Sequence, residues 1–226
     1  MPFIARIRKD PEVRRTELID AAFELFCSAG YEQTMIIDIV KRAGVAKGTF
    51  YYYFPTKEAI LEAICNRWDT ELAVSFRLKG RRDTALGTLQ AFILQMTLPS
   101  QLDVLFEKLC EENQFNLLYQ IWQRETKNVF NPLLVDLIRQ GNQEGTMQVT
   151  CINETLAFFW SALECLWDAL YLREPSDILR NKIKVAEAVL ERILGTEEGA
   201  LQLSVAWPQE LLGNDAVLFT PQPASR

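Results

Sequence analysis

Apolar residues recur every three or four positions along nearly the whole chain, and this period limits the possible folds more than any other feature. The segment after Pro11 shows it clearly, with apolar side chains at Ile19, Ala22, Phe23 and Phe26. This spacing places them on one face of an α-helix. No segment shows the sustained alternation that a half-buried strand requires. The sequence therefore predicts an all-α protein.

Glycine, proline and short polar runs interrupt this period and divide the chain into helices. We expect helices from Pro11 to Gly30, around Ile36–Val40, from Ala46 to Tyr53, from Thr56 to Phe76, and at roughly 84–97, 100–111, 114–144, 153–172 and 177–194. Pro132 should kink the helix over 114–144. We expect a small domain over residues 1–57, a larger helical domain over 58–195, and a loosely structured tail over 196–226.

The net charge of −6 and the pI near 4.9 seem unsuited to a nucleic-acid-binding protein. Residues 1–60, however, hold nine basic and eight acidic residues, whereas the remainder holds 15 basic and 22 acidic ones. The acidity therefore belongs to the C-terminal part. Only charges within about one Debye length of the phosphates affect DNA affinity, so the overall charge does not exclude DNA binding.

The chain contains no histidine. This removes the commonest general base, the usual Ser/His and Cys/His arrangements, and most designs of zinc and di-iron sites. A phosphate-binding glycine loop and a nucleophile elbow are also missing from the sequence. These absences disfavour an α-helical enzyme with an appended N-terminal domain, and we expect that the protein is not an enzyme and uses no metal and no cofactor.

Cysteine content and hydropathy predict the compartment. The five cysteines form no C-x-x-C pair and have apolar neighbours, which favours buried, reduced thiols over a redox switch. The N-terminus is basic and leads directly into an amphipathic helix, unlike a secretory signal. The most apolar stretch, Leu156 to Leu172, is shorter than a bilayer span and contains Glu164 and Asp168. We therefore expect a cytoplasmic protein without a membrane anchor.

The stretch from Thr34 to Lys57 reads TMIIDIVKRAGVAKGTFYYYFPTK. It predicts two short helices joined by a turn that contains Gly44, which is the pattern of a helix-turn-helix. On a helical wheel of the second helix, Phe50 and Phe54 lie on the side that faces the protein. Gly48, Thr49 and Tyr52 lie on the opposite side, Lys47 and Tyr51 on one flank, and Tyr53 on the other.

The outward residues suit a DNA major groove. Gly48 allows close approach of the backbone, Thr49 can contact a base edge or a thymine methyl, and Tyr52 can reach bases or phosphate. Three successive tyrosines could instead pack between helices, but a short helix whose two phenylalanines face the core cannot bury every side. We predict that Thr34, Lys47, Gly48, Thr49, Tyr51, Tyr52, Tyr53 and Lys57 bind DNA, with the two lysines contacting phosphates.

The same stretch resembles the DNA-binding signature of the tetracycline-repressor (TetR) family, T-x-x-x-D-I-A-x-x-A-G-V-S-K-G-T-[LF]-Y-x-[HY]-F-x-[SN]-K-[ED]-x-L. The matching residues are Thr34, Asp38, Ile39, Ala43, Gly44, Val45, Lys47, Gly48, Thr49, Phe50, Tyr51, Tyr53, Phe54, Lys57 and Glu58. Upstream, AAFELF at 21–26 and Gly30-Tyr31 also match. The chain departs from the family where Val40 and Ala46 replace alanine and serine, where Ile37 replaces a polar residue, and where Tyr53 replaces the frequent histidine.

The resemblance implies a homodimer whose two recognition helices read a palindromic operator in double-stranded DNA. It also implies that the last two long helices form the dimer interface. The sequence agrees, because the helix over 153–172 is apolar on nearly every side and the helix over 177–194 carries an apolar stripe. Upstream of the first helix, Arg6, Arg8 and Lys9 form a basic arm that either binds DNA or is merely solvated.

A small hydrophobic or cationic effector is expected to release the protein from DNA. Candidate ligand contacts are Phe92, Tyr119, Trp122, Phe159 and Glu164, with Phe115 as a further aromatic. Aromatic residues at helical spacing also form ordinary cores, and Glu164 on an apolar helix could instead pair with another protein group. The alternative is a regulator without an inducer, acting constitutively or through a protein partner.

Overall fold

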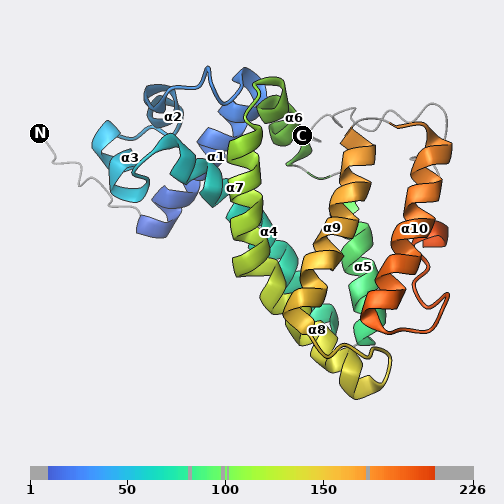
Figure 1. Ribbon diagram of the computed structural model, residues 1–226. Coiled ribbons are helices and arrows are strands. Elements are labelled where there is room, and N and C mark those ends of the chain that lie inside the picture. The colour runs from blue at the N-terminus through green and yellow to red at the C-terminus, as the bar shows by residue number, and fades with distance from the viewer. Residues whose placement is uncertain (1–9, 81–82, 98–99, 101, 172–173, 207–226) are drawn as a thin grey trace, which may run out of the picture. The chain divides into compact units, whose positions relative to one another are not determined.

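The computed structural model describes residues 10–80, 83–97, 100, 102–171 and 174–206. Within these residues the chain is helical and contains no strand, so the predicted all-α fold is confirmed (Figure 1). The helices are α1 (Pro11–Ala29), α2 (Ile36–Arg42), α3 (Lys47–Tyr53), α4 (Lys57–Gly80), α5 (Ala85–Thr97), α6 (Asp103–Glu111), α7 (Phe115–Glu125), a π-helical turn η1 (Thr126–Phe130), α8 (Asn131–Glu144), α9 (Ile152–Tyr171), α10 (Ser176–Leu194) and α11 (Leu203–Ala206).

The expected helix over 114–144 is interrupted rather than simply kinked. Its α-helical pattern changes to a π-helical turn over Thr126–Phe130, and α8 begins directly afterwards. Pro132 lies in the first turn of α8, where its missing N–H leaves no α-helical bond unmade. The irregularity expected at the proline therefore lies just before it.

The chain forms two compact units, and the first boundary between them along the chain follows residue 69 rather than residue 57. Among the described residues, unit 1 comprises those within 10–69 and 102–125, and unit 2 comprises those within 70–100 and 126–206. The helix α4 begins in unit 1 and ends in unit 2, and α6 and α7 return to unit 1. The small N-terminal domain expected over 1–57 is thus larger than predicted, because two helices far along the chain complete it.

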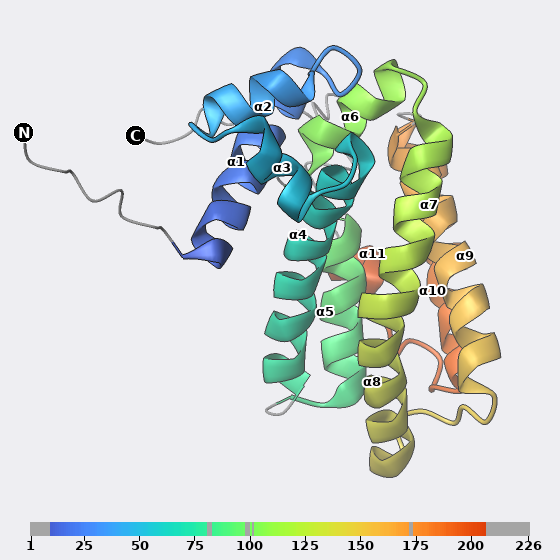
Figure 2. The ribbon, with the colours of Figure 1, turned by 90° about the vertical axis from the view of Figure 1, so that its left-hand side faces the viewer.

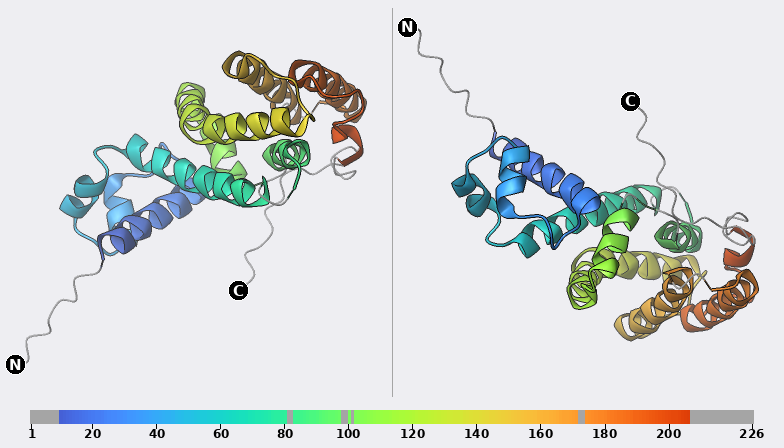
Figure 3. Two further views of the ribbon diagram at one scale, coloured as in Figure 1. Left: turned by 90° about the horizontal axis from the view of Figure 1, so that it is seen from below. Right: turned by 90° about the horizontal axis from the view of Figure 1, so that it is seen from above.

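Unit 1 has a core built from the apolar faces of α1 to α4, closed by α6 and α7 (Figure 2). The helix α1 begins as predicted, with Asp10 Oδ1 accepting from the N–H of Glu12 at 2.8 Å and Pro11 in the first turn. Fully buried side chains in this core include Ile19, Phe26, Ile39, Phe50, Ile60, Leu105 and Leu109. Figure 3 shows α1, α2 and α3 gathered around the first half of α4.

Unit 2 is centred on aromatic side chains from α5, η1 and α9. Phe92 contacts Phe130 and Trp160 with ring centroids 5.6 and 6.1 Å apart. The Trp160 Nε1–H donates to Asn131 Oδ1 at 2.8 Å, and the Trp167 Nε1–H donates to the Met96 carbonyl at 2.8 Å. Both indole N–H groups are thereby satisfied, that of Trp160 inside the apolar core and that of the partly buried Trp167 at its edge. The antiparallel helices α9 and α10 lie side by side in this unit (Figure 1).

The expected tail over 196–226 is held to unit 2 along its first part. Leu201 and Leu203 are buried, and the N–H of Leu201 donates to Glu191 Oε1 at 2.9 Å. The N–H of Gln202 donates to Gln90 Oε1 at 3.0 Å, and α11 packs on α5 and α10. Residues 196–206 are therefore ordered, contrary to the prediction, and 207–226 lie outside the described residues.

Two expectations concern the cysteines and the membrane. All five cysteines are free, and Cys65 is buried as expected, but Cys151 and Cys165 are exposed and so contradict the expectation of burial. In the part of the chain that the structure describes, no helix is both long and apolar enough to cross a bilayer.

Candidate nucleic-acid interface

The helices α2 and α3 form a helix-turn-helix because the turn between them is closed by local hydrogen bonds. The Ala43 N–H donates to the Ile39 carbonyl at 2.9 Å, and the Val45 N–H donates to the Val40 carbonyl at 3.0 Å. Gly44 has φ 64°, and a Cβ placed there would meet no atom within 4 Å. The turn therefore requires glycine for its left-handed backbone rather than for space.

The helix α3 presents its side chains as the helical wheel predicts. Phe50 and Phe54 are 0% and 2% exposed and face the core of unit 1. Tyr52 is 78% exposed, Gly48 is exposed, and Thr49 is partly exposed. A Cβ on Gly48 would meet no atom within 4 Å, so the backbone is open to an approaching surface.

The three tyrosines of α3 differ in exposure. Tyr51 is 48% exposed and lies under the ammonium of Lys47, which is 5.9 Å from its ring centroid. Tyr53 is half-buried and packs against the core, with its ring in edge-to-face contact with Tyr52 at 4.9 Å. Tyr51 and Tyr52 are therefore available to a partner, while Tyr53 is partly occupied by the protein.

The N-terminus of α3 lacks a side-chain cap. Ala46 stands at the N-cap position and makes only a backbone contact, accepting from the Thr49 N–H at 2.9 Å. A serine there would supply a hydroxyl acceptor for an unsatisfied N–H. The departure from the family signature at Ala46 therefore leaves first-turn N–H groups of α3 without an acceptor side chain at the N-cap.

Thr34 is not placed to contact DNA, contrary to the prediction. It is 2% exposed, and its hydroxyl donates to the carbonyl oxygen of Gly30 at 2.6 Å. The α2 N-terminus is instead formed at Met35, whose N–H donates to Asp38 Oδ2 at 3.2 Å. Thr34 therefore shapes the turn between α1 and α2 from inside the protein.

Lys57 is half-buried and contacts protein groups, while its phosphate contact stays a prediction. Its ammonium donates to the carbonyl oxygens of Tyr31 at 2.7 Å and Thr34 at 3.2 Å. It also lies 4.2 Å from the centre of the Tyr31 ring. Two carbonyl oxygens and an aromatic face satisfy this cation inside unit 1.

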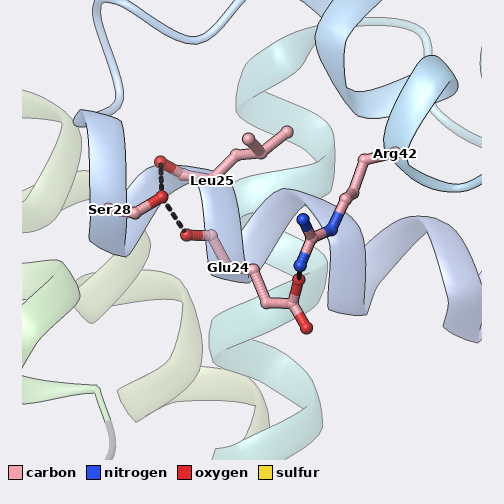
Figure 4. Close-up of polar contacts among 4 residues, drawn as sticks. All are labelled: Glu24, Leu25, Ser28 and Arg42. Atoms are coloured by element: carbon pink, nitrogen blue, oxygen red, sulfur yellow. Dashed lines mark hydrogen bonds and ion pairs between the residues drawn. The ribbon is translucent and has the colours of Figure 1, made fainter.

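The basic residues near the helix-turn-helix differ in how far they are already paired. Arg42, at the end of α2, forms an ion pair with Glu24 of α1, and Ser28 donates to the backbone of the same turn of α1 (Figure 4). Among the described residues, Lys41 and Lys47 form no ion pair and both are exposed. These two lysines are the cations most available to a phosphate.

The five predicted ligand contacts do not form one site within either unit. Tyr119 and Trp122 belong to unit 1, where Tyr119 is 61% exposed on α7. Phe92 and Phe159 belong to unit 2 and are buried in its aromatic core. Glu164 is partly exposed on α9, so it does not carry the desolvation cost that suggested a cationic partner.

A polar cluster at α4 and α7, of which only Glu125 is fully buried, was missed by the sequence reasoning. Glu125 is 3% exposed and accepts from Asn66 Nδ2 at 2.9 Å, and Arg124 forms an ion pair with Glu62. Burial, and secondly the negative charge of Glu125, raise the pKa of Asp69 to about 7. Burial also raises the pKa of Glu125. Nothing in the local pattern distinguishes these acids from solvated ones.

Residues 18–64 match the family described as bacterial regulatory proteins, tetR family. The regulator YuxN of Bacillus subtilis is 31% identical over 99 residues, which are 43% of this chain and 31% of that protein. The fatty acid metabolism regulator protein of B. subtilis is 45% identical over 53 residues, or 24% and 27% of the two chains. These alignments thus span about a third of the relatives' lengths. The regulator YfiR of B. subtilis is 22% identical over 209 residues, or 87% and 98%.

Solved structures share the fold. The fatty acid degradation regulator FadR from Bacillus halodurans has a TM-score of 0.56 at 22% identity, over 83% of this chain and 97% of that one. RolR in complex with its ligand resorcinol has a TM-score of 0.62 at 17% identity, over 87% and 95%. At these identities the likeness establishes the helical architecture, including its C-terminal part.

Proposed function

We propose that this chain, which belongs to the tetR family of bacterial regulatory proteins, is a sequence-specific DNA-binding transcriptional regulator. It acts as a repressor that a small-molecule effector releases from a palindromic operator. The observation that carries the proposal is the orientation of α3, whose Phe50 and Phe54 are buried while Gly48, Thr49 and Tyr52 face outward. No catalytic activity is proposed, and the site of action is the cytoplasm, where the DNA lies.

The outward face of α3 has the chemistry of a groove-reading surface. The side chain of Thr49 offers a hydroxyl and a methyl group, and that of Tyr52 offers an aromatic ring and a hydroxyl. Because Gly48 has no side chain, the helix can lie close to the base edges. Lys41 and Lys47 supply the charge that neutralises phosphates and fixes the position of the helix on the duplex.

A homodimer supplies the second reading helix, and the outer faces of α9 and α10 are its proposed interface. Phe158 on α9 is 67% exposed, and Val185 and Val189 on α10 are 64% and 41% exposed. The same open face of α10 carries Ala188 and Ile193, and Lys184 and Arg192 flank it. A second copy related by twofold symmetry would cover these apolar side chains and match the symmetry of a palindromic site.

The effector is proposed to act on unit 2 and to be small and hydrophobic or cationic. RolR is a protein solved with resorcinol, and FadR from Bacillus subtilis is one solved with stearoyl-CoA. In the present chain, Phe92 and Phe159 are 0% and 1% exposed, so an apolar effector would have to displace packed aromatic side chains. The π-helical turn η1 adjoins this cluster through Phe130, and such turns are frequent at functional sites.

The same dense packing favours the alternative, a regulator without a small-molecule inducer. A thermal-shift screen of hydrophobic and cationic compounds separates the two, because a ligand that binds the native state raises its melting temperature. A compound that raises the melting temperature and weakens DNA binding supports the effector. No stabilising compound across a broad library favours constitutive or protein-controlled regulation.

The DNA-binding proposal is tested by selecting duplexes from a random pool with the purified full chain. We expect enrichment of a palindrome with two half-sites separated by one or two turns of DNA. The Lys47→Ala variant should bind every duplex more weakly than the wild type does, whatever the sequence of the duplex. It should also reduce the slope of log affinity against log salt by about one per half-site. A pool that shows no enrichment contradicts the proposal.

A further inference from the structure

The turn between α1 and α2, residues 30–34, is held by side chains from two distant parts of unit 1. From the α6–α7 connection, Glu112 Oε2 accepts from the Glu32 N–H at 3.0 Å, and Gln114 Nε2 donates to Glu32 Oε1 at 2.5 Å. From α4, Lys57 donates to the carbonyl oxygens of Tyr31 and Thr34. The backbone of this turn is thus fixed by groups that lie outside α1 and α2.

Gly30 provides the space for the carboxylate of Glu112. Its backbone has φ 93° and ψ 157°, a conformation that is essentially restricted to glycine. A Cβ on Gly30 would overlap the carboxylate oxygen of Glu112. The conformation of Gly30 and the position of Glu112 are therefore matched, and Glu112 fills the volume that a side chain on residue 30 would need.

The end of α6 orients Glu112 and Gln114. The Asn113 N–H donates to the Cys110 carbonyl at 3.0 Å, and the Gln114 N–H donates to the Leu109 carbonyl at 2.8 Å. With Asn113 at φ 58°, these two bonds form a Schellman motif. Leu109, which accepts one of the bonds, is fully buried in the unit 1 core. The side chains on either side of Asn113 therefore project from a fixed backbone.

The turn leads directly into the helix-turn-helix. The Thr34 hydroxyl closes the turn on Gly30, and α2 begins two residues later at Ile36. Ile39 and Val40 of α2 are buried in the same core as Phe50 of α3. Because α2 and α3 pack together in this way, a shift of the turn would change the orientation of both helices.

We propose that Glu112 and Gln114 are positioning residues for DNA recognition, latching the α1–α2 turn so that α3 is presented in its reading orientation. This inference rests on the proposed function. Neither residue lies on α3, and both lie outside the segment 18–64 that matches the family. The latch thus makes DNA recognition depend on the α6–α7 connection.

The test compares Glu112→Ala with Glu112→Gln and Glu111→Ala. Glutamine keeps a carbonyl oxygen that can accept from the Glu32 N–H, whereas alanine removes it. Glu111 is an exposed neighbour that pairs with Lys108, so its substitution is a matched control for lost charge. Affinity is measured by fluorescence anisotropy at fixed salt, with the duplex that the wild-type chain selects from a random pool and with a shuffled duplex of the same composition.

We expect Glu112→Ala to lose about five- to tenfold in affinity for the selected duplex, which matches the net contribution of one typical hydrogen bond. Glu112→Gln and Glu111→Ala should stay within about twofold of the wild type. Binding to the shuffled duplex should be unchanged, because it depends on phosphate charge. Hydrogen exchange in peptides covering residues 30–34 should be faster in Glu112→Ala alone.

The inference is overturned if Glu112→Ala binds the selected duplex as the wild type does, or if it loses affinity for both duplexes equally. It is also overturned if exchange over residues 30–34 is unchanged. A wild-type chain that selects no duplex contradicts the proposed function instead, and the exchange measurement still reports whether the latch holds the turn.

Discussion

Lys57 binds the backbone of Tyr31, with its ammonium 2.7 Å from the Tyr31 carbonyl oxygen and 4.2 Å from the centre of the Tyr31 ring. A lysine at the start of the helix that follows a helix-turn-helix suggests a phosphate contact. Here the ammonium instead contacts backbone carbonyl oxygens and an aromatic ring of unit 1. It ties the N-terminus of α4 to the turn that precedes α2.

Replacing this lysine should therefore affect stability before it affects phosphate binding. We expect Lys57→Met to lower the free energy of unfolding by about 1–3 kcal/mol, because carbonyl oxygens of Tyr31 and Thr34 lose their donor. Denaturant unfolding measures the change. Lys41→Met is the control, because Lys41 is exposed and unpaired among the described residues, and its loss should cost less than about 0.5 kcal/mol. A stable Lys57→Met with a reduced salt slope of DNA binding would instead assign Lys57 to the phosphates.

Two glycines of the helix-turn-helix should respond differently to alanine. Gly44 has φ 64°, so Gly44→Ala should lower the free energy of unfolding by about 1–2 kcal/mol although no atom is in the way. Gly48 lies within α3 and is exposed, so Gly48→Ala should leave stability unchanged or raise it by about 0.5 kcal/mol.

The same Gly48→Ala variant should nevertheless weaken binding to the selected duplex by about 1–2 kcal/mol, because the added methyl group keeps the helix away from the bases. Thermal melting and fluorescence anisotropy on the same samples separate the two effects. Equal DNA affinity of Gly48→Ala and wild type would show that α3 does not approach the duplex at this position.

Asp69 should make the protein less stable as the pH rises. Its pKa is raised from 3.8 to about 7, mainly by burial and then by Glu125, so the folded state holds the proton more tightly than the unfolded state. The stabilisation is complete below about pH 4 and is lost as the pH rises toward 7. We expect Asp69→Asn to be more stable than wild type by about 1–3 kcal/mol at pH 8 and equal to it near pH 4. Denaturant unfolding at both pH values checks this, and a variant that is less stable at pH 8 contradicts it.

The proposed dimer predicts that a charge on the outer face of α10 dissociates it. We expect Val185→Glu to raise the dimer dissociation constant by about tenfold or more, measured by light scattering. Val13→Glu is the matched control, because Val13 is also an exposed valine, at 49%, but lies on α1. An unchanged oligomeric state of Val185→Glu would place the interface elsewhere.

The cysteines report on the same interface. Cys165 lies two helical turns after Phe158 on α9 and is exposed, as is Cys151. In the proposed dimer Cys165 is covered, so it should react slowly with a thiol reagent in the wild type and quickly in Val185→Glu. Cys151 should react quickly in both proteins.

Sequence periodicity predicted the parts of the site that depend on local geometry. The faces of α3 follow from 100° per residue, and the glycine at 44 follows from the turn, because both depend only on neighbours in the chain. The protein contacts of Thr34 and Lys57 could not be predicted, because their partners are backbone carbonyls that only the tertiary fold brings near. A polar residue near a DNA-binding helix carries no local signal of whether it faces outward or inward.

Long-range packing explains the remaining differences. The helices α6 and α7 complete unit 1 through Leu105, Leu109 and Ile121, whose spacing indicates amphipathic helices but not which core they join. The aromatic character of Phe92 and Phe159 suggests ligand contacts, but aromatic residues at helical spacing also build an ordinary core, and both side chains are buried in one. The latch residue Glu112 was missed because it contacts a residue 80 positions away.

The central claim is that the outward face of α3 reads bases. It is tested most directly by selecting duplexes from one random pool with the wild type and with Tyr52→Ala, whose side chain is 78% exposed in the wild type. The account predicts that both proteins select the same half-site spacing, and that Tyr52→Ala loses preference at one or two base pairs of each half-site. Identical base preferences in the two selections would contradict it.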